Sequence, residues 1–318
     1  MNTTVIICSV NRPMILHETV WGLTKQTVKP DSIVLSLCDE TSALSQTRSL
    51  SGVRCIFGPQ GSSVQRNTAI PLAPTPYVLF LDDDVELAPE YIAEMESAFE
   101  RDPAIAAAIG KVVADGATSG KGIDRAEALK AVENQTGCRI CPTIGTDDYY
   151  GCNMFVRGDL LKKEQFDDRL PLYAWLEDRD FLWRCAKHGK IVRNHAALVA
   201  HLGTRTGRTS DVRYGYTKIA NPYYLWKKSV ISSLPEVIVR YWMKTTFANL
   251  IRAIISRSPQ RGDYRKRLRG NFLAYRDVMR FRLHPENVLN IPDPKDAAKT
   301  PQPGEATEAW RSVPTRST

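Results

Sequence analysis

Long hydrophobic runs are missing from this chain of 318 residues. No stretch of about 18 uncharged apolar residues occurs, so no membrane-spanning helix is expected. The opening residues also lack the basic segment and small-residue cleavage site of a secretory signal. Hydrophobic residues still make up 43% and charged residues 25% of the chain. This composition indicates a globular protein of roughly one or two domains, and it excludes a fully disordered chain or a collagen-like fibre.

Cysteine is scarce, with seven residues, an odd number. Several lie in apolar, strand-like runs, where a thiol behaves as a small hydrophobe. Cys138 and Cys141 form an isolated CxxC pair, which without a second pair or a nearby His is more typical of a structural arrangement than of a zinc or redox site. This usage excludes a disulfide-stapled scaffold and predicts a cytoplasmic, reduced location.

Acidic residues are nearly absent from one stretch near the C-terminus. Between Arg240 and Arg282, twelve Lys and Arg residues stand against only Asp263 and Asp277. The stretch therefore carries +10, and the rest of the chain −2, of the net charge of +8. A partner of opposite charge is predicted for it, such as a membrane surface, a phosphorylated ligand or nucleic acid.

Strand-like and helical patterns alternate through the first half of the chain. The predicted strands are residues 5–8, 33–37, 53–57, 77–81 and 104–109, and the predicted helices are residues 14–24, 64–72 and 89–101. Further candidates are strands at 150–156, 191–193 and 197–201 and helices at 125–133 and 175–188. The alternation predicts an α/β fold, a doubly wound, mostly parallel sheet flanked by helices.

Polar residues follow four of these predicted strands, at residues 9–12, 39–41, 58–61 and 82–84. They are rich in Asp, Asn, Arg and Gly. Ligands of parallel sheets bind beyond the carboxyl ends of the strands. The pattern therefore predicts one polar cleft that contains several carboxylates.

Asp82, Asp83 and Asp84 directly follow the most apolar predicted strand. Three adjacent carboxylates repel one another unless a cation lies among them, and Mg²⁺ or Mn²⁺ prefers such oxygen ligands. The alternative is a solvated acidic turn or a helix N-cap, where aspartate is common.

A second acidic cluster holds Glu177, Asp178 and Asp180, between Trp175 and Trp183. On a helix, Glu177 and Asp180 share one face and Asp178 points elsewhere. A carboxylate at a helix start beside aromatic residues is a candidate general base. The same charges could instead complement the helix macrodipole.

Four isolated polar residues are weaker candidates. Asp39 closes the second predicted strand, where an acid is usually a turn residue. Arg66 and Asn67 open a helix after a Gly-containing loop, and could contact phosphate or be solvated. His201 ends an apolar run and gains a role only if it meets the aspartates in space.

In their order, these residues resemble an inverting nucleotide-sugar glycosyltransferase of family two, with the single-domain GT-A fold. The resemblance extends over residues 4 to about 202 and rests on six motifs. The first strand and its turn, with Ser9, Asn11 and Arg12, resemble the opening of the family, although Val10 stands where an aromatic residue is usual.

Asp39 matches the acid that holds the nucleotide base in this family, although residues 38–42 read CDETS in place of the usual DDGS. Gly61, Arg66 and Asn67 resemble the Gly-rich loop and the helix that follows it. The aspartates at 82–84 match the family's D-x-D metal motif. Gly151 and Asn153 lie in a run similar to the strand that lines the donor and acceptor pocket.

Residues 166–167 and 177–184 resemble the family pattern FD…EDxDLxxR. The aspartate of the Glu177–Asp178 pair is the usual base, and His201 falls where many members place a metal-binding His. The resemblance implies that three further side chains contact substrate, namely Trp175, Asp180 and Arg184.

The implied reaction is a single displacement that inverts the anomeric carbon. Mn²⁺ or Mg²⁺ would lie between Asp84, Asp82, His201 and the donor diphosphate. Asp82 would hold the ribose or share the metal, Asp83 would contact substrate, and Asp178 would take the proton of the acceptor hydroxyl. The expected donor is a UDP- or dTDP-linked sugar. The expected acceptor is a saccharide or a lipid-linked molecule in the synthesis of a surface polysaccharide or glycolipid.

The predicted organisation has three parts. A catalytic domain covers residues 1–220, with a nucleotide-sugar half at about 1–110 and an acceptor half at about 111–220. A basic helical extension follows at 221–285. The Pro-rich residues 286–318 are predicted to be a disordered tail.

The extension contains an amphipathic pattern over residues 237–255. Its apolar stripe consists of Val239, Met243, Phe247, Leu250 and Ile254. The stripe could pack on the catalytic domain, or it could attach the protein to the anionic inner face of the plasma membrane. No nucleic-acid-binding motif occurs, so nucleic acid is not an expected partner.

Two other classes of protein stay open. A sugar nucleotidyltransferase would usually carry an N-terminal Gly-rich loop for the triphosphate, but residues 9–13 contain no Gly. A non-enzymatic basic adaptor for membranes or nucleic acid would use its acids structurally. Metal-dependent binding of UDP or dTDP would separate the adaptor from the enzyme.

Overall fold

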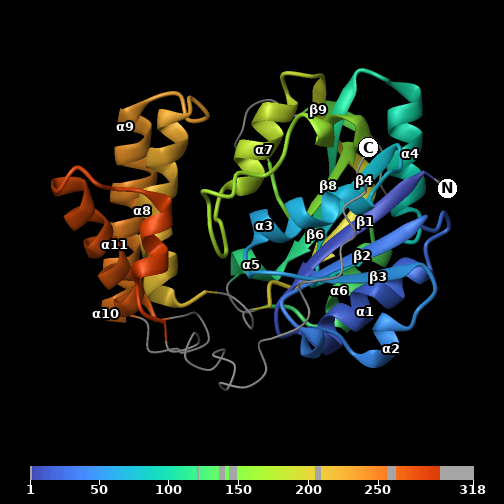
Figure 1. Cartoon of the computed structure of the whole chain (residues 1–318), viewed down its shortest axis with the longest axis horizontal. Coiled ribbons are helices and arrows are strands. Elements are labelled where there is room, and N and C mark those ends of the chain that lie inside the picture. The colour runs from blue at the N-terminus through green and yellow to red at the C-terminus, as the bar shows by residue number, and fades with distance from the viewer. Residues whose placement is uncertain are drawn as a thin grey trace, which may run out of the picture.

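The fold is described from a computed structural model of residues 2–119, 122–135, 140–142, 149–204, 209–255 and 263–293. At its centre lies one nine-stranded sheet of order β3-β2-β1-β4-β8-β6-β9-β5, with β7 paired to β9. A group of C-terminal helices packs beside the sheet and its covering helices (Figure 1).

The strands are β1 (Thr3–Ser9), β2 (Ser32–Leu37), β3 (Val53–Phe57), β4 (Tyr77–Asp82), β5 (Val85–Leu87), β6 (Ile105–Asp115), β7 (Ile140–Pro142), β8 (Asn153–Arg157) and β9 (Lys190–His201). The α-helices of the sheet domain are α1 (Pro13–Thr24), α2 (Ser45–Arg48), α3 (Ser62–Ala69), α4 (Tyr91–Arg101), α5 (Gly116–Ser119), α6 (Arg125–Glu133) and α7 (Glu177–Cys185). The C-terminal helices are α8 (Asp211–Lys227), α9 (Leu234–Glu236), the π-helix η5 (Val237–Met243), α10 (Lys244–Ile255) and α11 (Tyr264–Met279).

Six of the nine strands run in one direction. Strands β1, β2, β3 and β4 pair in parallel, β8 is antiparallel to β4, β6 is antiparallel to β8, and β9 is parallel to β6. Only β5, β7 and β8 run against this direction. The predicted α/β fold with a mostly parallel sheet is confirmed.

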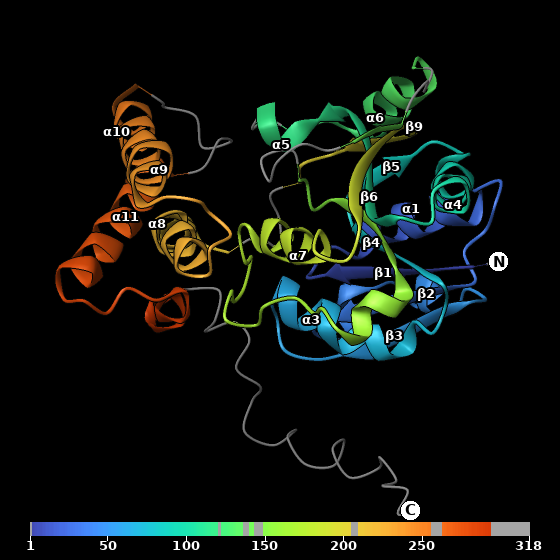
Figure 2. The same ribbon diagram turned by 90° about the horizontal axis from the view of Figure 1, so that it is seen from above.

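Alternating side chains of the central strands build two cores, one on each face of the sheet. In β1, Val5 and Ile7 pack against α1 and α4, whereas Ile6 packs against the face covered by α3 and α7. Figure 2 shows these helix pairs on opposite sides of the strands. Both faces are buried, which explains the continuous apolar runs at residues 5–8 of β1 and 77–81 of β4.

The C-terminal half of the sheet differs most from the prediction. The strand predicted at residues 104–109 continues as β6 to Asp115, and the strands predicted at 191–193 and 197–201 form one strand, β9. Gly110 pairs with Asn194 and Lys111 with Leu198, so residues 195–197 form a bulge. This bulge interrupts the apolar alternation without ending the strand. Strand β5 and helix α2 were not predicted.

Helix α8 crosses residue 220, the predicted end of the catalytic domain. It packs against α11 and, through its last turns, against the loop before α7. Cys138 and residues 294–318, most of the predicted tail, lie outside the described residues. No described helix is both long and apolar enough to cross a membrane.

A buried carboxylate joins the C-terminal helices to α7. Asp180 is fully buried, and its side chain lies 2.6 Å from Lys228 Nζ and 3.0 Å from Arg184 Nη2. Lys228 directly follows α8 and also contacts Asp167 at 2.6 Å. A buried charge is tolerated when it is paired in this way.

Replacement of Lys228 tests this link. Lys228→Met leaves two carboxylates short of a cation, so the free energy of unfolding should fall by about 1 to 3 kcal/mol in chemical denaturation. The matched control is Lys227→Met, which changes an exposed neighbour and should have little effect. Equal stability of the two variants would contradict a stabilising role for this ion pair.

Candidate active site

A cavity of about 410 Å³ lies at the carboxyl ends of β1 and β4, between the sheet and the C-terminal helices. Its walls come from the turns after β1 and β4, from α3, from the start of α7, from the end of β9 and from η5. The predicted site residues that line it are Arg12, Arg66, Asp82, Asp83, Asp84, Gly151, Trp175, Glu177, Asp178 and His201.

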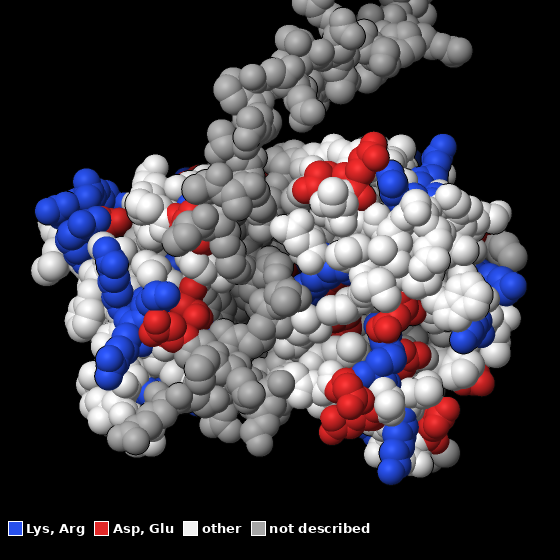
Figure 3. Space-filling view, turned by 90° about the horizontal axis from the view of Figure 1, so that it is seen from below, with Lys and Arg blue, Asp and Glu red and all other residues white. Residues whose placement is uncertain are grey.

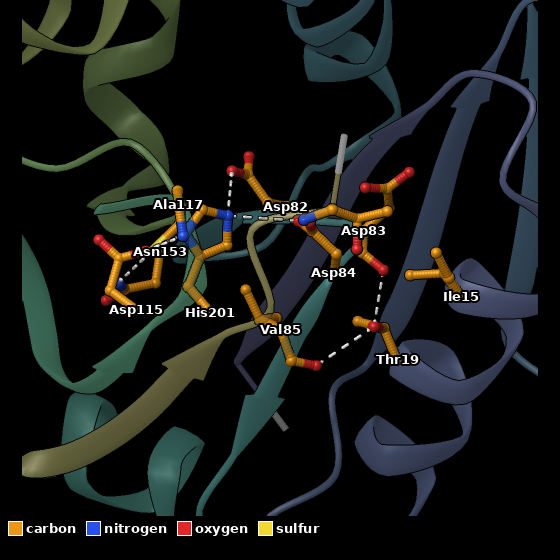
Figure 4. A network of polar contacts seen from close by, with 12 residues as sticks. Ile15, Thr19, Asp82, Asp83, Asp84, Val85, Asp115, Ala117, Asn153 and His201 are labelled. Atoms are coloured by element: carbon orange, nitrogen blue, oxygen red, sulfur yellow. Dashed lines mark hydrogen bonds and ion pairs between the residues drawn. The ribbon is translucent and has the colours of Figure 1, made fainter. Parts of the chain in front are cut away.

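The aspartates after β4 meet His201 at the end of β9. His201 Nε2 lies 3.4 Å from an oxygen of Asp84 and 3.9 Å from an oxygen of Asp82 (Figure 4). Asp84 and His201 are buried, while Asp82 is partly open to the cavity. One ligand atom of each of the three side chains lies within 4.8 Å of the others.

A third carboxylate, that of Asp115, contacts the other ring nitrogen of His201. His201 Nδ1 donates a hydrogen bond of 3.0 Å to Asp115, which also accepts a hydrogen bond of 2.9 Å from the Tyr150 hydroxyl. Burial lowers the pKa of His201, but the hydrogen bonds to Asp115 and Asp84 outweigh it and raise this pKa to about 10. The surrounding carboxylates therefore favour positive charge at this point of the cavity.

Asp83 faces away from His201 and is held by the turn after β1. Its carboxylate accepts hydrogen bonds from Ser9 and from Arg12 Nη1, the latter at 2.6 Å. Arg12 Nη1 also lies 3.7 Å from Asp84. Burial raises the pKa of Asp83 and Arg12 opposes this shift, so the turn after β1 stabilises the aspartate turn after β4.

Arg66 joins the aspartates to the second acidic cluster. It is buried in α3, and its guanidinium lies 2.8 Å from Glu177 and 3.4 Å from Asp82. A planar guanidinium can serve two carboxylates at once. The two acidic clusters found in the sequence are therefore parts of one ionic network.

Asp178 lies at the start of α7, against the backbone of Gly151. A Cβ atom at Gly151 would lie 3.0 Å from an oxygen of Asp178, so a glycine leaves room for this carboxylate. Burial raises the pKa of both Asp178 and Glu177, and the charge of Asp178 raises that of Glu177 further. A carboxylate with a raised pKa is a stronger base than one in water.

The loop before α7 has an unusual backbone. Leu172, Ala174 and Leu176 have positive φ angles of 61°, 46° and 76°. The left-handed conformation costs a non-glycine residue about 1–2 kcal/mol, and such strain concentrates at functional sites. The loop is held by a hydrogen bond from Ser62 N to the Leu172 carbonyl and by one from Asn221 to the Trp175 carbonyl.

Several predicted substrate-binding residues do not line the cavity. Asp39 is exposed and caps the short helix Glu40–Ser42, where the hydrogen bonds from Thr41 and Ser42 lower its pKa. It still lies at the carboxyl end of β2, beside β1. Asn11 adopts a positive φ of 54° in the turn after β1.

The other predicted contacts have structural partners. Asn67 holds the Phe166 backbone with two hydrogen bonds of 2.8 Å. Asn153 is fully buried and accepts hydrogen bonds from Tyr91 and from Gly110 N. Asp180 and Arg184 pair with each other, as described above.

The residues present fit a divalent cation. Asp82, Asp84 and His201 offer two carboxylates and one imidazole, a donor set that suits Mn²⁺ or Mg²⁺. Metal-binding histidines commonly donate a hydrogen bond from the other ring nitrogen to a carboxylate, which orients the imidazole. Asp115 is such a partner for His201. Sequence reasoning missed Asp115 and Tyr150.

A family model described as Glycosyl transferase family 2 matches residues 4–164. No curated protein matches the sequence. The fold is similar to that of S. aureus TarS 1-349, with 15% identity, a TM-score of 0.53, and coverage of 88% of this chain and 92% of that one.

Two further solved structures share the fold. The mannosyltransferase PcManGT from Pyrobaculum calidifontis, in complex with GDP-Man and Mn²⁺, has 13% identity and a TM-score of 0.51, and the match covers 91% of this chain and 86% of that one. GalNAc-T7 with UDP, GalNAc and Mn²⁺ has 14% identity and a TM-score of 0.50, with coverage of 82% and 58%. At these identities the similarity shows the GT-A fold alone.

The contact between Asp115 and His201 gives a prediction for metal affinity. Asp115→Asn removes the charge that holds the imidazole in place, and should weaken Mn²⁺ binding about 10- to 100-fold in calorimetry. Asp159→Asn changes an exposed carboxylate paired with Arg157 and serves as the control. Unchanged Mn²⁺ affinity in Asp115→Asn would show that this contact does not support a metal site.

Proposed function

The chain belongs to glycosyl transferase family 2, and we propose that it is an inverting, metal-dependent enzyme that moves a sugar from a nucleotide-diphosphate donor to a hydroxyl of a saccharide or lipid-linked acceptor. The expected products are surface polysaccharides or glycolipids. The observation that carries the proposal is that two acidic clusters line one cavity. Asp82, Asp84 and His201 lie on one side, and Glu177 and Asp178 lie on the other. Arg66 contacts both clusters.

The aspartate side of the cavity is proposed to hold the donor. Asp84, Asp82 and His201 would hold Mn²⁺ or Mg²⁺, which when bound neutralises charge on the diphosphate leaving group. Arg12 keeps Asp83 and Asp84 in place. S. aureus TarS in complex with UDP-GlcNAc and PcManGT in complex with GDP-Man and Mn²⁺ support a nucleotide-sugar donor. The prediction of a UDP- or dTDP-linked sugar rests on the sequence resemblance.

The side of the cavity formed by α7 is proposed to activate the acceptor. Asp178 would take the proton of the attacking hydroxyl, and Glu177 would position Arg66 between the two clusters. Partial burial keeps Asp178 poorly solvated, which favours proton transfer to it. Trp175 supplies an apolar wall against which a sugar ring can pack.

The rival functions fit less well. A nucleotidyltransferase needs cationic or glycine-rich contacts for a triphosphate, but in the turn after β1 Ser9 and Arg12 bond to Asp83. An adaptor protein would have no need for a cavity that gathers five acidic side chains and a histidine. The cytoplasmic location stays a prediction from the cysteine content.

The first test screens nucleotide sugars for metal-dependent hydrolysis, which needs no acceptor. The wild-type protein with Mn²⁺ or Mg²⁺ should release the nucleotide diphosphate from one donor, and EDTA should stop the release. Asp84→Asn removes one ligand charge and should abolish turnover and weaken binding of the diphosphate. Full activity of Asp84→Asn, or release by the wild-type protein that continues in EDTA, would refute the metal-dependent reaction.

The second test separates the base from the donor site. Asp178→Asn keeps the size of the side chain but cannot accept a proton, so kcat should fall by about 10²- to 10⁴-fold. Donor affinity should stay near that of wild type, because Asp178 has no part in the aspartate cluster. The control is Asp180→Asn, which removes charge from the same helix outside the cavity and should act on stability instead. A folded Asp178→Asn protein with normal transfer would move the role of base to Glu177.

A further inference from the structure

Helix α10 exposes the apolar side of its amphipathic pattern to solvent. Six large apolar residues here are exposed to solvent, namely Met243, the last residue of η5, and Phe247, Leu250, Ile251, Ile254 and Ile255 within α10. Phe247 is 64% exposed and Ile254 is 75% exposed. We call these six residues the outer face of α10. The predicted apolar stripe therefore does not pack on the catalytic domain.

The inward side of α10 is polar. Thr246 shares a hydrogen bond of 2.7 Å with the Tyr275 hydroxyl of α11, and Asn249 donates one of 2.9 Å to Asn271. Asn249 is buried in α10, and Asn271 is fully buried in α11. A surface helix of a globular protein normally turns its apolar side inward. Here specific hydrogen bonds fix the opposite orientation, and an apolar surface is left uncovered.

Basic residues lie on α10 itself and on the exposed side of the neighbouring helix α11. Lys244 and Arg252 lie on α10, which has no acidic residue. The neighbouring helix α11 and its C-cap expose one stripe of mixed basic and apolar residues, namely Arg265, Arg269, Phe272, Arg276, Met279 and the C-cap residue Arg280. Figure 3 shows that Lys and Arg side chains gather over the C-terminal helices at the left of the molecule.

We propose that the outer face of α10 docks on the surface of an anionic lipid bilayer, with the basic residues of α10 and α11 at the lipid headgroups. Apolar side chains on one side of a helix, flanked by Lys and Arg, match the boundary between acyl chains and headgroups. Each basic residue near such a surface adds to the attraction. A second copy of the chain suits this face less well, because a symmetric contact would bring its basic residues together.

The docking face connects to the candidate active site through η5. Within this seven-residue π-helix, Arg240 and Tyr241 line the cavity, while Val239 and Met243 are exposed at 62% and 61%. A protein docked by this segment would hold the cavity close to the bilayer. This step rests on the proposed function, and it narrows the acceptor to a lipid-linked molecule.

Vesicle binding of the full chain tests the docking. The probes are sucrose-loaded vesicles of about equal parts phosphatidylglycerol and phosphatidylcholine, and vesicles of phosphatidylcholine alone, with bound protein measured by sedimentation. The wild-type protein should bind the anionic vesicles, and binding should fall as salt is raised because the Debye length shrinks.

Two double variants divide the contributions. Phe247→Ser with Ile254→Ser should lower the partition coefficient at least tenfold, since two exposed apolar side chains can no longer enter the lipid. Lys244→Glu with Arg252→Glu should lower it by a similar factor and weaken its dependence on salt. The matched control is Trp21→Ser with Leu129→Ser, which changes exposed apolar residues of α1 and α6 at the opposite end of the molecule (Figure 2).

Two results would overturn the proposal. One is equal binding of wild type and the Phe247→Ser/Ile254→Ser variant to anionic vesicles. The other is a wild-type dimer in sedimentation velocity that this variant dissociates, with no vesicle binding, which would make a second copy the partner. Metal-dependent donor hydrolysis without vesicles is measured for every variant. It reports on the proposed reaction alone, so failure of the reaction and failure of docking are distinguishable.

Discussion

The structure depends on the way it accommodates negative charge at the end of β4. Asp83 and Asp84 are buried next to one another, and burying a charge is costly unless a partner of opposite sign is present. Arg12 after β1 pairs with Asp83 and His201 at the end of β9 pairs with Asp84, while Arg66 in α3 contacts the neighbouring Asp82. Arg12 and His201 are far from β4 in sequence, so the folded sheet is what brings them to the aspartates. The folded sheet and the charged site therefore require each other.

Arg66 lies between two chemically different parts of this network. Because it contacts both Asp82 and Glu177, it separates a side rich in carboxylates and imidazole from a side where a carboxylate is poorly solvated. The first environment suits a cation and a diphosphate, and the second suits proton transfer. The strained loop at residues 172–176 presents the second side to the cavity, and hydrogen bonds from α3 and α8 hold it there. The C-terminal helices thus help to shape the cavity that the sheet begins.

Features set by residues close together in the sequence could be predicted, whereas features set by contacts between distant residues could not. Apolar runs located β1, β2, β3 and β4, and the aspartates at 82–84 followed from their place after β4. Asp115 could not be found, because its role depends on the length of β6 and on the bulge at residues 195–197 of β9. Asn153 and Asp180 matched a sequence pattern, yet their side chains are buried against Tyr91 and Lys228, partners that no local spacing reveals.

For the same reason, the sequence could not predict which side of α10 faces solvent. Periodicity identified the apolar stripe of residues 239–254, but periodicity cannot tell which way a stripe faces. The direction is set by Asn249 and Asn271, two buried polar side chains that satisfy each other only when α10 turns its polar side toward α11. With α10 turned the other way, the buried Asn271 would lose the hydrogen bond from Asn249, and an unpaired buried amide costs about 1–3 kcal/mol. The asparagine pair therefore holds the apolar side of α10 outward, next to η5, which lines the cavity.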